Sequence, residues 1–369
     1  MLTMDEATVL RVLTDLGAIP TAPLHEQAVA AYVVRFLRNN GLPFQVDPYG
    51  NIIATYRHGK PTQPLALVAH LDHPAFEITI AGPDRIAQGN LLGGVPAACF
   101  DRPVPALVIS EDTVANATII GYDVNRQTGR VASLSIECAE PVRVGAFGVF
   151  DLGAPRRDDE QIAMPAADDL AGVAAALLTL SDIAASHLDG TVYGVFTRAE
   201  EIGLVGASLV AQQKLLPLDT IVVSLECSRE LPGAQPGLGP VIRVGDRTRA
   251  FHPDGEAVLL AARERLVEVP VQRQLMSGGT CEATAFGSAG YRTTGVALPL
   301  INYHNVGPGD VIAPERINVR DFIGEVALLS AAVQVAGDGT PLTSELNLQQ
   351  RTQQFHERLR DTASTFHDL

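Results

Sequence analysis

The sequence predicts an α/β fold in which a mixed, mostly parallel sheet lies between helices and one β-rich module is inserted. Helical and strand patterns alternate after residue 164, which is typical of a parallel or mixed sheet. The apolar run 65–69, between Pro64 and Pro74, is short enough for a strand buried on both faces. Residues 74–163 consist of short β-rich runs and therefore predict the insert.

The expected elements can be placed along the chain in order. Thr3 and Glu6 form a possible capping box, and leucines at 10, 13 and 16 continue a helix that ends at Gly17. The later elements are a helix around 29–37, strands at 44–46, 52–56 and 65–69, β-rich runs at 117–124 and 131–136, an alanine-rich helix around 173–180, a strand at 191–197, a helix at 204–215, a strand at 220–225 and a polar terminal helix at 344–363.

The length of 369 residues suits about two domains. We expect one discontinuous domain from residues 1–73 and 164–345, an inserted β-rich domain from residues 74–163 and a helical tail from residues 346–369. No internal repeat or low-complexity tract suggests another arrangement.

Composition argues against several classes of function. A net charge of −15 disfavours contact with nucleic-acid phosphates. No apolar run approaches the roughly 18 residues of a membrane span, and residues 1–16 lack the pattern of a secretion signal. The four cysteines are far apart, which argues against a disulfide framework and a thiolate metal site. We expect a cytoplasmic protein that binds neither nucleic acid nor membrane.

Acidic and histidine side chains recur where predicted strands end, and open α/β sheets bind ligands at that edge. These side chains are suited to zinc, and to cobalt or manganese where carboxylates are numerous. Five ligands would suit two metal ions, with a short aspartate at a helix start as the bridge. The candidates are His70, Asp168, Glu200, Glu201, Glu226 and His304.

Each candidate also has a purely structural interpretation. A histidine after a strand is more often structural or exposed than a ligand. The pair Asp168-Asp169 could simply cap the following helix. Glu200 and Glu201 could be a solvated pair, but they lie between a buried-looking strand and a glycine, where like charges need a cation. The recurrence of all these residues in one chain favours the metal site.

Six motifs that span nearly the whole chain match those of a known family in order and spacing. They are Asp47-Pro48-Tyr49-Gly50-Asn51-Ile52-Ile53-Ala54, Ala69-His70-Leu71-Asp72, Ala167-Asp168-Asp169 with Gly172, Thr197-Arg198-Ala199-Glu200-Glu201-Ile202-Gly203-Leu204, Ser277-Gly278-Gly279-Thr280 and Tyr303-His304. This set resembles the glutamyl and deblocking aminopeptidases, a family with two metals and tetrahedral, shell-like assemblies.

The resemblance implies a role for each matching residue. Asp72 would orient the imidazole of His70, and Glu200 would be the general base that acts on a metal-bound water. The segment Gly278-Gly279-Thr280 would approach the substrate. The implied ligands are His70 and Glu226 for the first metal, Glu201 and His304 for the second, and Asp168 as the bridge. The cofactors would be two divalent ions, zinc in the first place, with cobalt or manganese as alternatives.

The resemblance also implies a domain organisation. About 97 residues separate His70 from Asp168, which is where this family carries its insert. Residues 1–73 and 164–345 would be the catalytic domain, and residues 74–163 a β-barrel-like domain for dimerisation and assembly. The implied protein is a homo-oligomer, with the dodecamer as one assembly, and it acts on peptides with a free N-terminus.

Several residues depart from the family pattern. Leu170 stands where arginine is common, Glu226 where aspartate is usual, Cys281-Glu282 where Asp-Ala is usual and His73-Pro74 where Glu-Ile is frequent. These departures leave the preferred N-terminal residue and the native metal open. They also keep open a metal-dependent amidase or deacylase for small non-peptide substrates. A catalytically silent scaffold is the third possibility, although Glu200 has no obvious structural purpose apart from the metals.

Overall fold

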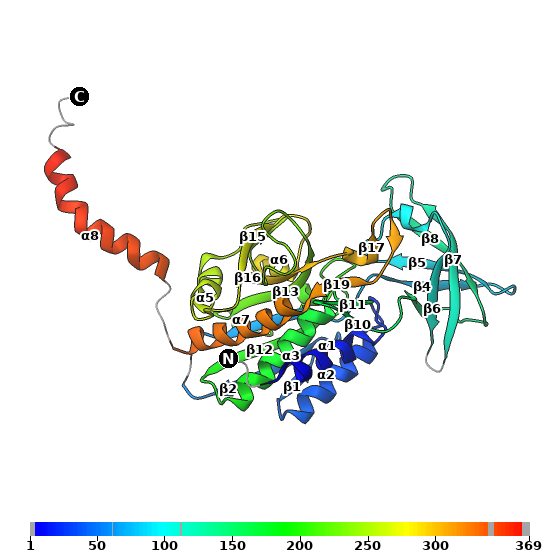
Figure 1. Cartoon of the computed structure of the whole chain (residues 1–369), viewed down its shortest axis with the longest axis horizontal. Helices are drawn as coiled ribbons and strands as arrows, with labels where there is room; N and C mark the ends of the chain where they lie inside the picture. Colours follow the sequence, from blue (N-terminus) through cyan, green and yellow to red (C-terminus); the bar gives the residue numbers. More distant parts are fainter. Residues whose placement is uncertain (1–3, 61, 111–112, 339–342, 364–369) are drawn as a thin grey trace.

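The computed structural model describes residues 4–60, 62–110, 113–338 and 343–363, with backbone alone for 343–349. Its centre is an eight-stranded mixed sheet (Figure 1). Four neighbouring strands, β12, β3, β13 and β16, run parallel, so their carboxyl ends meet at one edge. In spatial order the strands are β1 (Phe44–Val46), β2 (Ile52–His58), β12 (Gly190–Thr197), β3 (Leu65–His70), β13 (Ile221–Arg229), β16 (Arg292–Leu300), β14 (Val241–Asp246) and β15 (Gln272–Met276).

Helices cover both faces of this sheet. Alternate side chains of β3 point to opposite faces, so Leu65 and Leu67 join the larger core while Ala66 and Val68 join the smaller one. This explains why every residue of β3 is buried. The larger core packs against α1 (Glu6–Gly17), α2 (Gln27–Asn39), α3 (Leu170–Ala185), α5 (Pro253–Glu264) and α7 (Val319–Gly337), and the smaller against α4 (Val205–Gln212) and α6 (Glu282–Ser288).

The insert is a closed six-stranded barrel at one end of the molecule (Figure 1). It has an apolar core of its own that includes Phe76, Ile78 and Ile136. Its strands are β4 (Ala75–Ala81), β5 (Ile86–Leu92), β6 (Val104–Ile109), β7 (Val114–Val124), β8 (Val131–Cys138) and β9 (Phe147–Phe150), and η1 (Ala97–Phe100) joins β5 to β6. The predicted fold class, a helix-covered mixed sheet with an inserted β-barrel-like unit, is confirmed.

Short strands carry the chain back from the barrel to the sheet. β11 (Gln161–Met164) pairs with β10 (Arg156–Asp158) and with β19 (Glu315–Asn318). A second small pair, β17 (Val306–Gly307) and β18 (Val311–Ile312), follows η2 (Tyr303–Asn305). The polar helix predicted at 344–363 corresponds to α8 (Thr343–Ala363), which lies apart from the sheet in Figure 1.

Two local predictions were wrong. Asp5, not Thr3, caps α1: its side chain accepts a hydrogen bond from the backbone N–H of Thr8, and Thr3 lies outside the described residues. Glu226 does not follow the end of its strand, because β13 continues to Arg229. The domain boundaries stay a prediction. Within the described part of the chain, no helix is long and apolar enough to cross a membrane.

Candidate metal centre

The predicted ligands converge at the carboxyl edge of the four parallel strands. His70 is the last residue of β3, and Glu226 lies in β13 beside it. Glu200 and Glu201 follow β12, and His304 follows β16. Because neighbouring parallel strands end at the same edge, residues far apart in the chain lie within a few ångströms of one another.

His70 faces three carboxylates with one ring nitrogen. Its Nε2 lies 3.4 Å from Oδ1 of Asp168, 3.6 Å from Oε1 of Glu226 and 3.9 Å from Oε2 of Glu200. Its Nδ1 lies 3.1 Å from the backbone carbonyl oxygen of Asp72, to which the ring donates when Nδ1 carries the proton. That contact leaves the lone pair of Nε2 directed at the carboxylates.

His304 repeats this arrangement on the other side of Asp168. Its Nε2 lies 3.3 Å from Oε1 of Glu201 and 3.7 Å from Oδ2 of Asp168. Its Nδ1 lies 2.7 Å from the carbonyl oxygen of Gly94, in the loop that follows β5 of the barrel. One oxygen of Asp168 therefore faces each histidine, and the barrel supplies a contact that orients one of them.

Several of the polar atoms that face one another here are unpaired and could serve as metal ligands. Among the described residues, His70 Nε2, Asp168 Oδ1 and Glu201 Oε1 are buried without a hydrogen-bond partner. Buried polar atoms are normally paired, and unpaired nitrogen and carboxylate oxygens at such spacing fit a divalent cation. Three sets of residues could each hold an ion, because within each set one potential ligand atom per residue lies within 4.8 Å of the others. The sets are His70, Asp168 and Glu226; Asp168, Glu201 and His304; and His70, Glu200 and Glu201.

The electrostatics are unfavourable for the side chains alone. Burial, and then the neighbouring Glu226, raise the pKa of Asp168 well above its usual value. Burial likewise raises the pKa of Glu200 and of Glu201, while it lowers the pKa of His304 to about 3. Burial also acts to lower the pKa of His70, but the carboxylates around it raise that pKa well above its usual value. A cation would relieve this crowding of like charges.

Two buried carboxylates hold the backbone of the candidate ligands. Asp72 accepts hydrogen bonds from the N–H groups of Glu200 (2.9 Å) and Glu201 (3.0 Å). Glu315 accepts from the N–H groups of Asp168 (2.9 Å) and His304 (2.8 Å). The sequence analysis missed Glu315, because it lies in a four-residue strand with no motif around it.

The two interpretations of the aspartate pair both apply, one to each residue. Asp169 is the N-cap of α3 and accepts a hydrogen bond from the N–H of Gly172. A Cβ at Gly172 would lie 2.3 Å from Oδ1 of Asp169, so the cap requires glycine there. The side chain of Asp168, one residue earlier, points into the cluster of histidines and carboxylates. Leu170 is fully buried in the larger core.

Several residues in and beside the cluster have left-handed backbone angles that non-glycine residues seldom adopt. Ala199, directly before Glu200, has φ of 56°, and His304 itself has φ of 56°. Such conformations cost free energy and persist where the surrounding structure holds them, which is common at functional sites. The strain therefore lies at the same place as the unpaired polar atoms.

A family model described as M42 glutamyl aminopeptidase matches residues 133–317, just over half of the chain. The chain belongs to this family. It is an aminopeptidase, as the sequence motifs predicted, and the members of the family depend on metal. A relative from Acetivibrio thermocellus, named "Putative aminopeptidase", is 23% identical over 349 residues, which cover 89% of this chain and all of the relative.

Solved structures show that this M42 chain has a known fold. Aminopeptidase APDkam598 from the archaeon Desulfurococcus kamchatkensis superposes with a TM-score of 0.75 at 22% identity, over 89% of this chain and 95% of that one. The TET1 peptidase of Pyrococcus horikoshii, which can assemble into a tetrahedron or a large octahedral shell, has a TM-score of 0.73 at 20% identity, over 89% and 99%. At these identities the likeness shows the fold alone.

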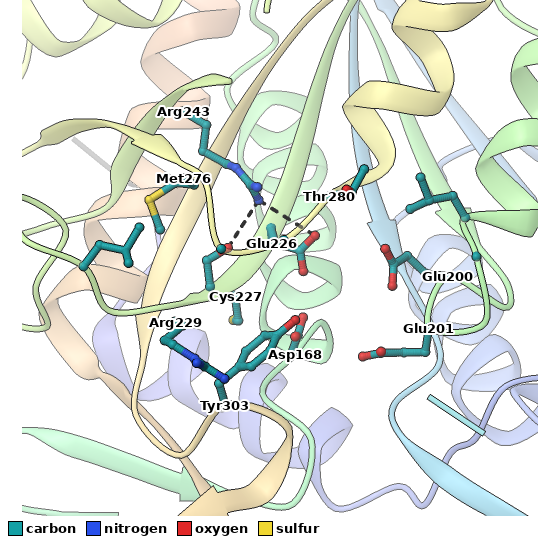
Figure 2. Close-up of a pocket in the computed structure, with 16 residues that line it drawn as sticks. Asp168, Glu200, Glu201, Glu226, Cys227, Arg229, Arg243, Met276, Thr280 and Tyr303 are labelled. Atoms are coloured by element: carbon teal, nitrogen blue, oxygen red, sulfur yellow. Dashed lines mark hydrogen bonds and ion pairs between the residues drawn. The ribbon is translucent and has the colours of Figure 1, made fainter. Parts of the chain in front are cut away.

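A cavity of about 290 Å³ opens beside the cluster of this M42 chain (Figure 2). Glu200 and Glu201 are at one side, and Asp168, Tyr303 and Arg229 at the other, with the Arg229 guanidinium 5.4 Å from the centre of the tyrosine ring. The predicted substrate residues Gly278, Gly279 and Thr280 all line this cavity. Their contact with substrate stays a prediction.

The cavity wall also contains residues that the sequence analysis did not select. Arg243 is the clearest case, because its guanidinium is buried and directed at Glu226 (Figure 2). Nothing in the run around Arg243 distinguishes it from an ordinary strand residue.

Cys281 and Glu282, which depart from the family pattern, are buried next to the cavity. Burial raises the pKa of the Cys281 thiol to about 12, and all four cysteines are free and buried. Glu282 is buried too and accepts a hydrogen bond from the Thr197 hydroxyl.

Proposed function

We propose that this aminopeptidase binds two divalent metal ions and uses Glu200 as its general base. The observation that carries the proposal is the position of Asp168, with one carboxylate oxygen toward His70 and the other toward His304. Two of the ligand groups share Asp168, as a bridging carboxylate between two ions requires. His70 and Glu226 would hold one ion, and Glu201 and His304 the other. Zinc suits this donor set, with cobalt or manganese as alternatives.

When bound, the ions would supply Lewis-acid chemistry, by lowering the pKa of a water and polarising the scissile carbonyl. Glu200 would accept the proton of the attacking water and pass it to the departing amine. Glu200 belongs to neither proposed ligand pair, it lines the cavity, and burial raises its pKa well above the usual value, as is common at catalytic sites. Asp72 would keep Glu200 in place through its backbone N–H.

The substrate would be a peptide with a free N-terminus. The cavity next to the proposed ions would accommodate the N-terminal residue of such a peptide. Gly278 and Gly279 carry no side chain, and the space around their Cβ positions is nearly empty, so a peptide backbone could approach them closely.

Free-amine and acylated substrates separate the two enzymatic hypotheses. The assay compares aminoacyl anilides with their N-acetylated forms, using the metal-free protein supplied with zinc, cobalt or manganese. We expect turnover of the free-amine forms alone, and only with metal. Turnover of acylated substrates, but not of free-amine ones, would support the amidase or deacylase hypothesis, which the departures at Leu170, Glu226 and Cys281 left open. No turnover of either series with any metal would favour the silent scaffold.

We also propose a cytoplasmic homo-oligomer in which residues 1–73 and 164–345 form the catalytic domain and residues 74–163 serve assembly. The support is the closed barrel, together with the shells formed by structural neighbours such as the P. horikoshii peptidase and a dodecameric TET1. Light scattering coupled to size-exclusion chromatography tests the assembly. A monomer at micromolar concentration would contradict it, and twelve subunits would match the dodecamer.

A further inference from the structure

Arg243 on β14 is a buried guanidinium with few partners. Its side chain is 2% exposed, yet it lies in the wall of the cavity next to Glu226 (Figure 2). Its Nη1 lies 3.3 Å from Oγ of Ser228 and 3.9 Å from Oε2 of Glu226. In the described part of the chain, its Nε has no hydrogen-bond partner. Burying a charge with so few hydrogen bonds is costly, so packing alone does not explain it.

The sheet leaves a path for this side chain. β16 lies between β14 and β13, and Arg243 pairs with Gly295 of β16, which pairs in turn with Ser224 of β13. Paired residues and their i+2 neighbours share a face of the sheet, so Arg243, Gly295, Ala297 and Glu226 all lie on one face. A Cβ at position 295 would lie 3.2 Å from Cδ of Arg243. The small residues of β16 thus allow the arginine to reach across a whole strand.

The two oxygens of Glu226 face different partners. Oε1 lies 3.6 Å from Nε2 of His70, inside the first ligand group, and Oε2 lies on the side of Arg243. A glutamate has one more side-chain torsion than an aspartate and loses more conformational freedom when it is fixed. A buried guanidinium on the outer oxygen limits that freedom before any ion binds.

We propose that Arg243 is a positioning residue for the first metal site: it holds Oε2 of Glu226, so that Oε1 stays directed at His70 and Asp168. This inference rests on the proposed dinuclear function. It predicts that Arg243 sets the metal affinity of one site in the absence of any substrate. Residues that hold a ligand in this way typically change metal affinity by about 10- to 100-fold when they are replaced.

The test is calorimetric titration of metal-free protein with zinc chloride alone. For the wild type we expect two binding events. Arg243→Met should weaken one event by about 10- to 100-fold and leave the other within about twofold. Arg243→Lys should weaken the same event less, because the ammonium keeps the charge but cannot contact Ser228 and Glu226 together.

The matched control is Arg292→Met, which removes a partly buried arginine at the first residue of β16. That end of the strand is opposite to the one at the cluster. Arg292 pairs with Asp254 at 3.2 Å, away from the cluster, so both zinc affinities should stay within about twofold. Thermal unfolding of each metal-free variant shows whether it is folded. If Arg243→Met does not fold, the comparison of Arg243→Lys with the wild type decides.

A double-mutant cycle with Glu226→Gln identifies the route of the effect. Arg243→Met should cause no further loss of zinc affinity in the Glu226→Gln background. An equally large loss there, or unchanged affinities in Arg243→Met, would overturn the proposal. Unchanged affinities with a selective loss of activity on acidic N-terminal residues would assign Arg243 to substrate recognition instead. A single binding event in the wild type would contradict the dinuclear function. In that case, a weaker event in Arg243→Met would still support the positioning role, and an unchanged event would overturn it.

Discussion

The interior of the barrel and the carboxyl edge of the sheet are both buried, but they bury different chemistry. The barrel encloses apolar side chains such as Phe76 and Ile136, and among its described residues no buried side-chain nitrogen or oxygen lacks a hydrogen-bond partner. The sheet edge buries His70, Asp168 and Glu201 with polar atoms left unpaired. The comparison shows that the chain accepts costly polar burial in the sheet and helices of the proposed catalytic domain, including the place where the candidate ligands converge, while the barrel packs conventionally.

The largest effect is expected at the polar edge. Glu200→Gln keeps the shape of the side chain but removes its capacity to accept a proton, so kcat should fall by about 10²- to 10⁴-fold. Steady-state kinetics on an aminoacyl anilide measures this loss, and metal analysis should show unchanged zinc content. Glu230→Gln, at an exposed glutamate beside the cavity, is the control. Activity within tenfold of the wild type would exclude Glu200 as the base.

The barrel should respond in stability rather than in chemistry. Ile136 is fully buried in the barrel core, and Ile136→Ala should lower the free energy of unfolding by about 2–5 kcal/mol through lost apolar contacts and a cavity. Denaturant unfolding measures it. Glu137→Ala, at the exposed neighbouring position, should change that free energy by less than about 0.5 kcal/mol. If Ile136→Ala also lost zinc affinity, the expected separation between a stabilising barrel and a chemical sheet edge would be wrong.

Glu325 tests whether the burial of a polar group that is not a proposed ligand carries a cost. It is fully buried in α7, and among the described residues neither of its carboxylate oxygens has a hydrogen-bond partner. Burial raises its pKa well above the usual value, and Asp321 adds to this. The folded carboxyl therefore keeps a proton that the unfolded one releases, so its contribution to stability is present at low pH and is lost as pH rises through the folded pKa.

Replacing Glu325 should remove that loss. Glu325→Met should raise the free energy of unfolding by about 1–3 kcal/mol at pH 8 and by less at pH 5. Denaturant unfolding at the two pH values measures the difference. Glu325→Gln, which keeps an unpaired polar group, should gain less. If Glu325→Met were less stable than the wild type at pH 8, the carboxylate would have a favourable role in the fold.

The smallest effect is expected in the cavity wall. Asp246 accepts hydrogen bonds from the N–H of Cys281 (3.2 Å) and the hydroxyl of Thr284 (2.6 Å), and the neighbouring Arg247 N–H donates to the carbonyl oxygen of Gly279 (2.9 Å). Asp246→Asn should loosen the glycine segment and lower kcat/KM by up to about tenfold, mainly through KM. Steady-state kinetics measures this, with the exposed Asp158→Asn as control. A change in kcat alone would argue against a role in substrate binding.

Sequence patterns located helices and strands well where the spacing of apolar residues fits only one type of element. The run 65–69 became a buried strand because apolar residues on both of its faces left no other place for it. The boundary errors lie where side chains compete: β13 continues past Glu226 because its ladder with β16 extends to Arg229. Asp5 caps α1 because its carboxylate reaches the Thr8 N–H.

The sequence by itself determined the family, the fold class and the set of acidic and histidine residues, because motif order and hydrophobic periodicity are properties of the chain. Only the tertiary structure decided how those residues are held. Gly94 contacts His304 across 210 residues, Glu315 contacts Asp168 across 147, and Arg243 reaches Glu226 over an intervening strand. No local pattern encodes such contacts, since they depend on which strands become neighbours when the sheet forms and the barrel closes.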